Sequence, residues 1–468
     1  MLHARSENLF TRAFWLGTVD ARALGLFRIA FGLTLLHDLA DWIPDLHAFL
    51  TDDGMLPRST LHANPANWWA RGAFDLVGSQ AGVAMVFAIG CFAVALFTLG
   101  VFTRAATIVS WLFLLSLHHR NPYVTDGADD LARVLLLWSI LVDLGARYSV
   151  DAWRSGRTIT DVPALGARLM QAQVATLYLV TAILKLRGGG WLSGDGVFRT
   201  LQLDGYQRPL GAWLLGHPAL CAMSSRVVPF VELAIAGAAF CPLWPRITRS
   251  MCIVLGAGLQ LGILCAMRVG MFTELMLAVL TLWIPFRVPA VVVRPEEEFG
   301  VARVVRVAFV VQFVIAIWDP FLGRRAPLPH VVQDERLLLS VALPYSLFDL
   351  TYEVAHWDAL GLLVDGSHVD VLSVVAPATQ ARGPGWHHHR WNKLTFKSLE
   401  RPLEMPALVA YFCRSYDAQT SSIQLASFTI VRTTAPARAR DAPVNASLER
   451  RETLFRHTCD DVAVSALE

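Results

Sequence analysis

Nine runs of apolar residues occupy the first two thirds of the chain, and they constrain its fold more than any other feature. They lie near residues 23–40, 81–101, 104–118, 131–146, 168–186, 227–244, 250–267, 270–286 and 301–319. Most approach the roughly 20 residues that a helix needs to cross the hydrocarbon core of a bilayer. The runs are continuous rather than alternating, which favours helices over the strands of a barrel. We predict an all-α polytopic membrane bundle of about nine spans.

Composition and charge agree with a membrane protein. Charged residues make up 17% of the chain, against roughly 25% in soluble domains. With the N-terminus inside, fourteen basic residues fall on the cytoplasmic side and nine on the other, as cytoplasmic loops prefer. We therefore expect a multi-pass protein of the cell membrane, with the bilayer as its partner, a cytoplasmic N-terminus and an extracytoplasmic C-terminal part. The net charge of +2 carries no signal for nucleic acid, and none is expected as a partner.

The chain changes character near residue 326. Residues 1–325 form the predicted membrane domain. Short strand-like runs with Gly, Pro and Asp breaks follow at 337–342, 360–364, 369–375, 407–412 and 427–431. They predict a small β-rich extramembrane domain over 326–432, and the polar residues 433–468 predict a disordered tail. Cys413 and Cys459 are expected to be able to pair if this part is extracytoplasmic.

Lysine is rare in this chain, which makes its one lysine within an apolar run informative. Of 40 basic residues only Lys185, Lys393 and Lys397 are lysines, and Lys185 ends the apolar run 174–186. A desolvated ammonium can lose its proton, whereas a guanidinium cannot at any accessible pH. We predict that Lys185 is a catalytic base. The plainer alternative is a lysine that snorkels from a helix end to the lipid headgroups.

Ionisable residues inside the predicted spans are the main candidates for a site, because each is costly unless it faces a cavity or a partner. The set is Arg28, His37, Arg133, Lys185, Glu232 and Glu274. Gln171, Tyr178, Thr181 and Lys185 recur at helical spacing, so one face of the fifth helix is expected to border a cavity or another polar helix.

Glu232 is the predicted counter-charge for either Arg133 or Lys185. We favour Arg133, because a guanidinium bonds a carboxylate with two parallel hydrogen bonds. That pairing would leave the Lys185 amine free to be neutral. Pairing with Lys185 would hold the amine charged and make it a poor base. The alternative for the whole set is a structural ion pair within the membrane.

The segment 118–133 reads as a turn followed by the start of a helix. Asp129 and Asp130 stand in the first turn, where the helix dipole favours carboxylates, and Asp129 is four residues before Arg133. This pattern alone is more typical of helix capping than of catalysis. The pair His118-His119 lacks the spacing and the carboxylate partner of a metal site, so no metal is expected.

Several segments together resemble one family. They are 26–32 (LFRIAFG), 121–133, 147–152 (RYSVDA), 178–186 with Trp191, Glu232, and 270–277 (GMFTELML). In this order they resemble the HTTM (horizontally transferred transmembrane) domain, the membrane module of vitamin K-dependent gamma-carboxylase, over roughly residues 15–320. A looser similarity at 364–370 and 390–393 is to the extramembrane part of bacterial relatives, which implies a bacterial inner-membrane protein.

The resemblance implies a carboxylase-like lyase. In that family a lysine matching Lys185 is the base on vitamin K hydroquinone, which with O₂ yields a strong base that modifies a polypeptide. Here the resemblance implies menaquinol as cofactor and a polypeptide or lipid as substrate. The implied cofactor-binding residues are Asp129, Arg133, Tyr178, Glu232 and Gln260.

The sequence departs from the family at two positions. Counting back from 147–151 places Asp129 near a quinone-contacting histidine of the animal enzyme, and counting back from 270–272 places Gln260 at another. Chemistry on a quinol is therefore possible here without carboxylation. The rival interpretation is a non-catalytic membrane protein, such as a maturation partner, a chaperone or a transporter-like scaffold, in which the ionisable residues only tie helices together.

Overall fold

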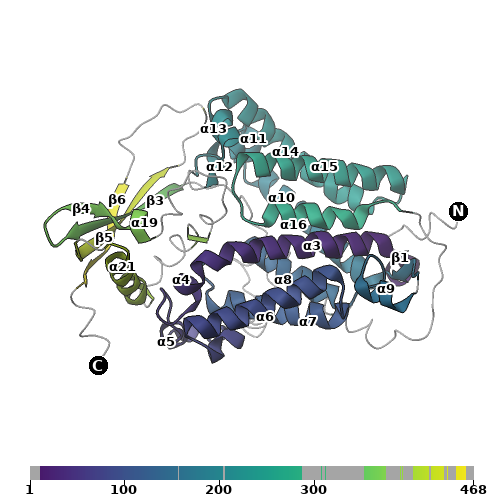
Figure 1. Ribbon diagram of the computed structural model, residues 1–468. Coiled ribbons are helices and arrows are strands. Elements are labelled where there is room, and N and C mark those ends of the chain that lie inside the picture. Colours follow the sequence, from purple (N-terminus) through teal and green to yellow (C-terminus); the bar gives the residue numbers. More distant parts are fainter. Residues whose placement is uncertain are drawn as a thin grey trace.

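A computed structural model describes residues 11–286, 353–375, 404–436 and 450–459, except 157, 204–205 and 421–422, together with residues 307, 311, 390, 391, 393 and 440. Long helices dominate it. They run along a common direction, and a small sheet from the C-terminal part lies at the end of the bundle away from β1 (Thr18–Asp20) (Figure 1).

Eight of the nine predicted spans correspond to helices. These are α3 (Ala21–Trp42), α6 (Gln80–Leu99), α7 (Thr103–Arg120), α8 (Gly127–Ser139), α10 (Leu165–Arg187), α14 (Pro218–Phe240), α15 (Pro245–Ala266) and α16 (Phe272–Leu280), which continues into η5 (Thr281–Trp283). The ninth, 301–319, lies almost wholly outside the described residues.

Five segments of the described chain are long and apolar enough to cross a membrane: Ala21–Leu50, α6, α10, α14 and α15. The prediction of nine spans is therefore not confirmed. The 13 residues of α8 cover only about 20 Å at 1.5 Å per residue, short of the ~30 Å of a bilayer core.

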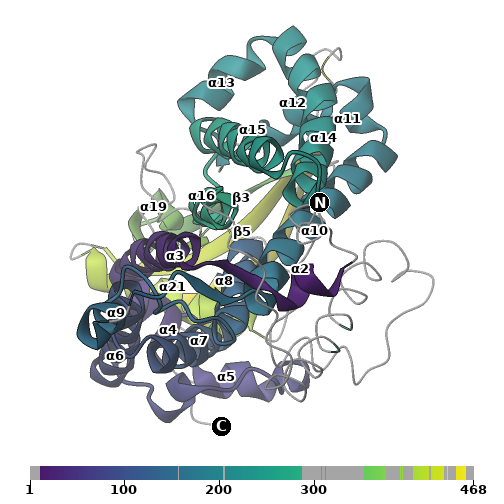
Figure 2. The same ribbon diagram turned by 90° about the vertical axis from the view of Figure 1, so that its right-hand side faces the viewer.

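The helices form two groups that share two connecting helices. In one group α3 packs on α6 and α6 on α7, and in the other α14 packs on α15. Between them, α10 contacts both α8 and α14, and α16 contacts both α3 and α15 (Figure 2). Almost all of α10 is buried, because it has neighbours from both groups.

Arg28, one of the predicted intramembrane charges, fastens the end of the first group. Its side chain is fully buried and donates to the backbone carbonyls of Thr98 (3.3 Å), Leu144 (2.8 Å) and Arg147 (3.3 Å). Gly100 ends α6 with φ +70°, and a Cβ there would lie 2.7 Å from an Arg28 nitrogen. This arginine therefore has a structural role, satisfying carbonyls at a helix end.

Short elements link the long ones. Before α3 stand α2 (Arg12–Leu16) and β1 (Thr18–Asp20), which pairs with β2 (Asp161–Pro163), and α9 (Val150–Ser155) precedes β2. The connection from α3 to α6 contains η1 (Ile43–Asp45), α4 (Leu46–Leu50), α5 (Arg58–Ala63), η2 (Pro65–Asn67) and η3 (Ala73–Leu76). After α10 come α11 (Gly190–Ser193), α12 (Gly196–Thr200) and α13 (Pro209–Leu215).

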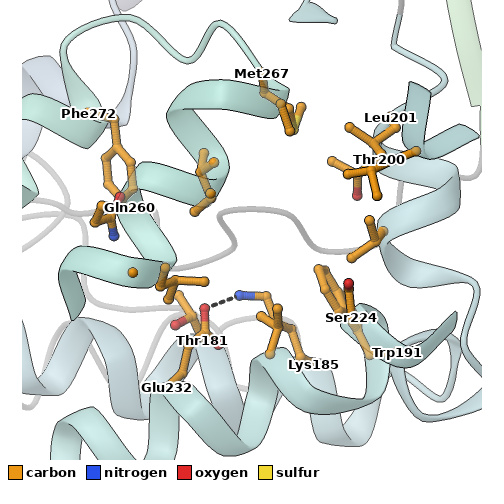
Figure 3. A pocket seen from close by; sticks show the side chains of 18 of the residues that line it. Thr181, Lys185, Trp191, Thr200, Leu201, Ser224, Glu232, Gln260, Met267 and Phe272 are labelled. Atoms are coloured by element: carbon orange, nitrogen blue, oxygen red, sulfur yellow. Dashed lines mark hydrogen bonds and ion pairs between the residues drawn. The ribbon is translucent and has the colours of Figure 1, made fainter. Parts of the chain in front are cut away.

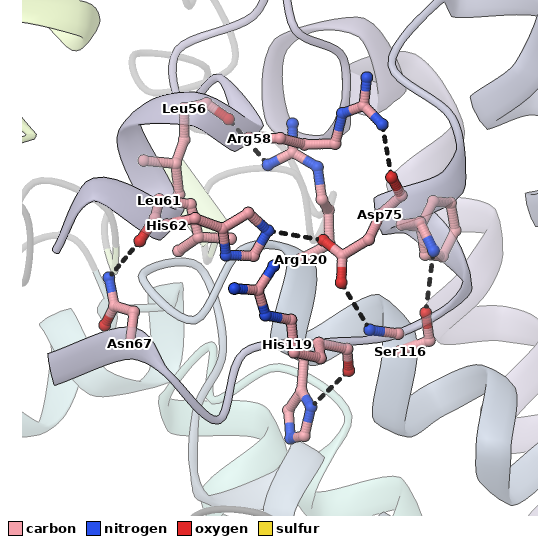
Figure 4. A network of polar contacts seen from close by, with 12 residues as sticks. Leu56, Arg58, Leu61, His62, Asn67, Asp75, Ser116, His119 and Arg120 are labelled. Carbon is pink, nitrogen blue, oxygen red and sulfur yellow. Dashed lines mark hydrogen bonds and ion pairs between the residues drawn. The ribbon is translucent and has the colours of Figure 1, made fainter. Parts of the chain in front are cut away.

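A polar network holds the connection from α3 to α6 (Figure 4). The buried Arg120 donates to the carbonyls of Leu56 (2.7 Å) and Thr51 (3.1 Å). Arg58 bonds both carboxylate oxygens of Asp52, and these side-chain hydrogen bonds lower the pKa of Asp52 below its usual value. His62 contacts Asp75 at 2.8 Å. The connection is therefore ordered by side chains that satisfy backbone groups.

The C-terminal part is a four-stranded antiparallel sheet with helices on it. The strands are β3 (Glu353–Leu363), β4 (His368–Asp370), β5 (Leu425–Pro436) and β6 (Arg450–Thr458), in the order β4-β3-β5-β6. The helices are α19 (Val371–Val375), which contacts β3, and α21 (Met405–Gln419), which contacts β5. Cys413 and Cys459 form a disulfide, which confirms that they can pair.

The expected strands of this part are confirmed only in part. The runs 360–364 and 427–431 fall in β3 and β5, and 337–342 lies outside the described residues. The prediction of a strand at 407–412 is wrong, because these residues belong to α21. Its apolar residues Leu408, Phe412 and Tyr416 recur at helical spacing and are buried. Within 369–375 only the start is strand, since Asp370 Oδ1 accepts from Leu372 N (3.1 Å) and α19 begins there.

The prediction of a disordered tail is also wrong for residues 450–458. Residues 450–458 form β6, which pairs with β5 from Ser427 to Thr434, and the disulfide joins its end to α21. This edge strand is mostly polar in sequence, and pairing with β5, the disulfide and the packing of Leu454 and Phe455 on the core hold it in place.

Candidate functional site

Three polar residues of α10 face one cavity. Tyr178, Thr181 and Lys185 follow each other at intervals of three and four residues, so they share one face of this helix. All three are buried and line a cavity of about 300 Å³. The predicted fourth member, Gln171, lies elsewhere and bonds Arg168 and the carbonyl of Leu282. The polar face of α10 thus does border a cavity at its C-terminal half.

Lys185 is paired with Glu232 of α14. The ammonium Nζ donates to Glu232 Oε1, and both side chains are at least nine tenths buried (Figure 3). Nζ also lies 5.0 Å from the ring centroid of Trp191, a favourable position for a cation. The second carboxylate oxygen, Oε2, has no partner with hydrogen-bond geometry among the described residues.

The prediction that Glu232 pairs with Arg133 is wrong. Arg133 instead contacts Asp130 and His118 and does not line the cavity. Depth along a span can be read from sequence, whereas the direction in which each helix turns its polar face depends on packing. The amine of Lys185 is therefore bonded by a carboxylate rather than free.

Gln260 of α15 supplies another polar wall of the cavity. Its Nε2 donates to Tyr178 Oη at 3.0 Å, while its Oε1 has no hydrogen-bond partner among the described residues. Gln260 is 1% exposed. Buried polar atoms are nearly always bonded in folded proteins, so two unpartnered acceptors in one cavity wall, Gln260 Oε1 and Glu232 Oε2, indicate room for a donor group.

The remaining walls are mostly apolar. Residues of α12, α13, α14, α15 and α16 contribute, among them Leu201, Leu210, Val228, Ile263, Met267 and Phe272. Thr200 and Ser224 add two hydroxyl-bearing side chains (Figure 3). An apolar cavity with a few convergent polar groups is the usual form of a small-molecule site.

Asp129 and Arg133 form part of a separate buried cluster. Arg390, from the C-terminal part, donates to both oxygens of Asp38 (2.7 and 2.9 Å) and to both oxygens of Asp129 (3.2 and 3.4 Å). His118 Nε2 lies 3.3 Å from Asp129 Oδ1. The structure thus brings Lys185, Tyr178, Glu232 and Gln260 together and leaves two predicted cofactor residues out.

Asp129 also has the capping role that its position predicted. Its Oδ2 accepts from Asp126 N (2.7 Å), and Asp126 Oδ1 accepts from Asp129 N (3.3 Å), which closes a capping box at the start of α8. The remaining intramembrane pair, His37 with Glu274, joins α3 to α16 at 2.9 Å.

Two members of the cluster around Asp129, namely Asp38 and Arg390, were not among the residues predicted from the sequence. Asp38 lies within the first predicted span, and its position beside His37 was a signal that the ionisable set leaves out. Arg390 had a weaker signal, the loose family similarity at 390–393. Trp391 packs on Phe49, with ring centroids 5.0 Å apart, and Lys393 lies 5.4 Å from the ring of Tyr206, so this segment touches both helix groups.

The fold and this cavity define a helical membrane protein with a buried polar pair at the wall of an apolar pocket. A family model described as HTTM domain matches residues 17–287, more than half of the chain. The chain therefore belongs to the HTTM domain family. No curated protein and no solved structure matches it.

Proposed function

We propose that this protein is a membrane enzyme that binds a quinol in the cavity beside Lys185 and takes a proton from it, as the resemblance to gamma-carboxylase implies. The observation that carries the proposal is the buried Lys185–Glu232 pair at the wall of an apolar cavity, where two acceptors have no partner among the described residues.

The residues of the cavity fit a quinol. Its two hydroxyl groups are donors, and Glu232 Oε2 and Gln260 Oε1 are buried acceptors that no described residue bonds. The volume of about 300 Å³ is at the lower end of small-molecule sites, which span roughly 300–1,000 Å³. Bound there, a vitamin K-type hydroquinone such as menaquinol would supply, with O₂, the strong base that modifies a polypeptide or lipid.

The ion pair changes the part that Lys185 plays in this proposal. Because Glu232 holds the ammonium, the proton acceptor is the pair as a unit rather than a lone neutral amine. Within the pair, Lys185 would pass a proton to Glu232, and the neutral amine would then take the hydroxyl proton of the ligand, which leaves the Lys185 ammonium beside the new negative charge. Tyr178 and Gln260 would orient the ring through their hydrogen bond.

Two features support an extracytoplasmic position for the C-terminal domain. The first is the disulfide Cys413–Cys459, since disulfides persist in oxidising compartments. The second is that β1, near the start of the described chain, and the four-stranded sheet lie at opposite ends of the bundle (Figure 1). In this orientation the N-terminus is cytoplasmic. A reporter fused after residue 330 should then be active outside the cytoplasm, and one fused after 160 only inside.

A second candidate, a non-catalytic membrane protein, is favoured by one observation. Lys185 and Glu232 join α10 to α14 directly, and an ion pair of this kind also serves as a link between helices. A maturation partner or scaffold would need the link without any chemistry.

Lys185→Arg separates the two functions, because arginine keeps the charge and cannot lose its proton. We expect a folded protein without activity. Activity is read by mass spectrometry of membrane peptides and lipids from cells with and without the gene, searching for an added CO₂ and for other mass changes. Lys185→Ala should lose activity too and regain part of it with small exogenous amines. An active Lys185→Arg variant would remove the proton-transfer role and leave the scaffold function.

A further inference from the structure

Two glycines on α15 form part of the cavity wall and are at the same time exposed. Gly258 and Gly262 are four residues apart, so they lie one above the other on one face of the helix. Both line the cavity, and both are exposed on the outside of the protein. A Cβ added at either position would meet no heavy atom of the described residues within 4 Å. The cavity is therefore open between these glycines and the helix opposite.

The helix opposite is α13. Leu210 and Leu214 line the cavity from this side, and Leu210 is exposed. The neighbouring outward side chains Trp213 and Leu261 are exposed and apolar. A rim of this composition suits lipid rather than water.

The depth of the opening points to the bilayer as well. α15 is one of the five helices that are long and apolar enough to span, and its 22 residues run from Pro245 to Ala266. At 1.5 Å per residue, Gly258 lies about 4 Å and Gly262 about 10 Å from the middle of the helix. Half the hydrocarbon core is about 15 Å thick, so both glycines lie within it when α15 crosses the membrane.

The inner end of the cavity selects for a polar head with donors. Glu232 and Gln260 each present a buried acceptor oxygen without a partner there, and Lys185 presents the one positive charge of the wall. At the outer end the glycines present no side chain, and Leu210 and Leu214 of α13 are apolar. Polarity thus decreases from the Lys185–Glu232 pair towards the opening.

We propose that the gap between Gly258 and Gly262 on α15 and Leu210 on α13 is a side entrance from the bilayer. Through it, a lipid with a donor-bearing head and an apolar chain reaches the Lys185–Glu232 pair, its chain remaining in the entrance. The inference deepens the proposed function and rests on it for the quinol head, whereas the route needs only the cavity and its opening.

Cysteine labelling in membrane vesicles tests the route without any assay of activity. Ser224 lines the cavity, and Ser224→Cys introduces a reactive thiol there. The free cysteines that are not buried, Cys91, Cys241 and Cys265, are first replaced by Ser. We expect the apolar reagent N-phenylmaleimide to label the new thiol at least tenfold faster than the membrane-impermeant 2-sulfonatoethyl methanethiosulfonate. Each rate is first divided by the rate of the same reagent with a free thiol in solution.

Closing the entrance should stop the labelling. Gly258→Leu with Gly262→Leu, or Leu210→Trp from the other side, should slow N-phenylmaleimide at least tenfold. The matched control is Gly237→Leu, since Gly237 is an exposed glycine of α14 with equally open surroundings and does not line the cavity. It should leave the rate unchanged. Two independent closures guard against one variant that fails to fold.

These outcomes distinguish failure of the side entrance from failure of quinol binding. Equal labelling by the charged reagent, or no effect of either closure in folded protein, would overturn the side entrance. Protection of the thiol by menaquinol-4, but less by the tail-less menadiol, both prepared reduced and used without oxygen, supports the entrance with its bound chain. Protection by neither, with labelling still blocked by the closures, keeps the entrance and removes the quinol from the proposed function.

Discussion

Two buried clusters of charged side chains, one around Arg390 and one around Lys185, both combine basic and acidic residues. They differ in how many hydrogen bonds their carboxylates accept. Around Arg390, four hydrogen bonds to Asp38 and Asp129 and a fifth to the carbonyl of Val124 satisfy the guanidinium, which also stacks 4.0 Å from the ring of Trp42. Around Lys185, one ion pair stands beside a cavity and leaves acceptors without partners.

This difference separates a structural link from a binding site. Arg390 bonds both carboxylates around it, so loss of this cluster should mainly destabilise the fold. A cluster with unpartnered buried acceptors is costly in the absence of a ligand and gains when one binds. We therefore assign the Arg390 cluster to holding the C-terminal domain on the bundle, and the Lys185 pair to function.

The largest effect is expected from Arg390→Met. It leaves two carboxylates buried without their cation, and removal of one partner of a buried ion pair costs about 3–5 kcal/mol. Thermal unfolding in detergent measures the loss. Asp38→Asn added to Arg390→Met should restore part of it, because it removes one of the unpaired charges. Wild-type stability in Arg390→Met alone would make the cluster dispensable and erase the contrast.

A smaller loss is expected from Lys185→Met, about 2–3 kcal/mol, because the cavity can admit water to the Glu232 carboxylate that is left behind. Replacing both partners by Lys185→Met and Glu232→Leu should recover most of that stability while still abolishing function. The exchange Lys185→Glu with Glu232→Lys is the matched test of pairing. Losses of the two single exchanges that merely add in the double variant would contradict the ion pair.

Gln260→Leu should change stability by less than about 1 kcal/mol. It removes a hydrogen bond to Tyr178, typically worth about 1 kcal/mol, and at the same time an unpartnered buried oxygen whose burial is unfavourable. Affinity for a donor-headed ligand such as menaquinol, measured by equilibrium binding, should fall by about tenfold. A stability loss as large as that of Arg390→Met would place Gln260 among the structural residues instead.

The smallest effect is expected for the partly exposed pair Arg58–Asp52, which serves as a reference for the two buried clusters. Arg58 lowers the pKa of Asp52 in the folded state, whereas the unfolded value is about 3.9. The contribution of this pair is therefore fully present above about pH 4 and is lost as the pH falls through the lower folded pKa. Asp52→Asn should remove that part of the acid sensitivity, seen as a flatter dependence of the unfolding temperature between about pH 4 and pH 2.

Sequence periodicity predicted the helices well where runs were long. α3, α6, α7, α10, α14 and α15 were all anticipated, because burial of an apolar surface in lipid or protein needs the same composition along the whole helix. Short runs were less informative: 407–412 suits a strand or a helix over six residues, and only the fifteen residues of α21 reveal the helical period.

The same reasoning reached part of the candidate site. The spacing of Tyr178, Thr181 and Lys185 predicted a shared face, and the structure gives that face a cavity. The partner of Glu232 was predicted wrongly, and Asp129 and Arg133 proved to belong to another cluster. Contacts between helices depend on how each helix is rotated about its axis, which short-range spacing does not contain.

By itself the sequence determined that this is a helical membrane-type chain with charges inside its helices and a chemically distinct C-terminal part, since hydropathy and helical period are properties of single segments. Only the tertiary structure decided which charges meet. Lys185 finds Glu232 across 47 residues, and Asp38 finds Arg390 across 352. Such pairs form because a buried charge must find a partner in the packed state, and which partner lies within reach is set by packing alone.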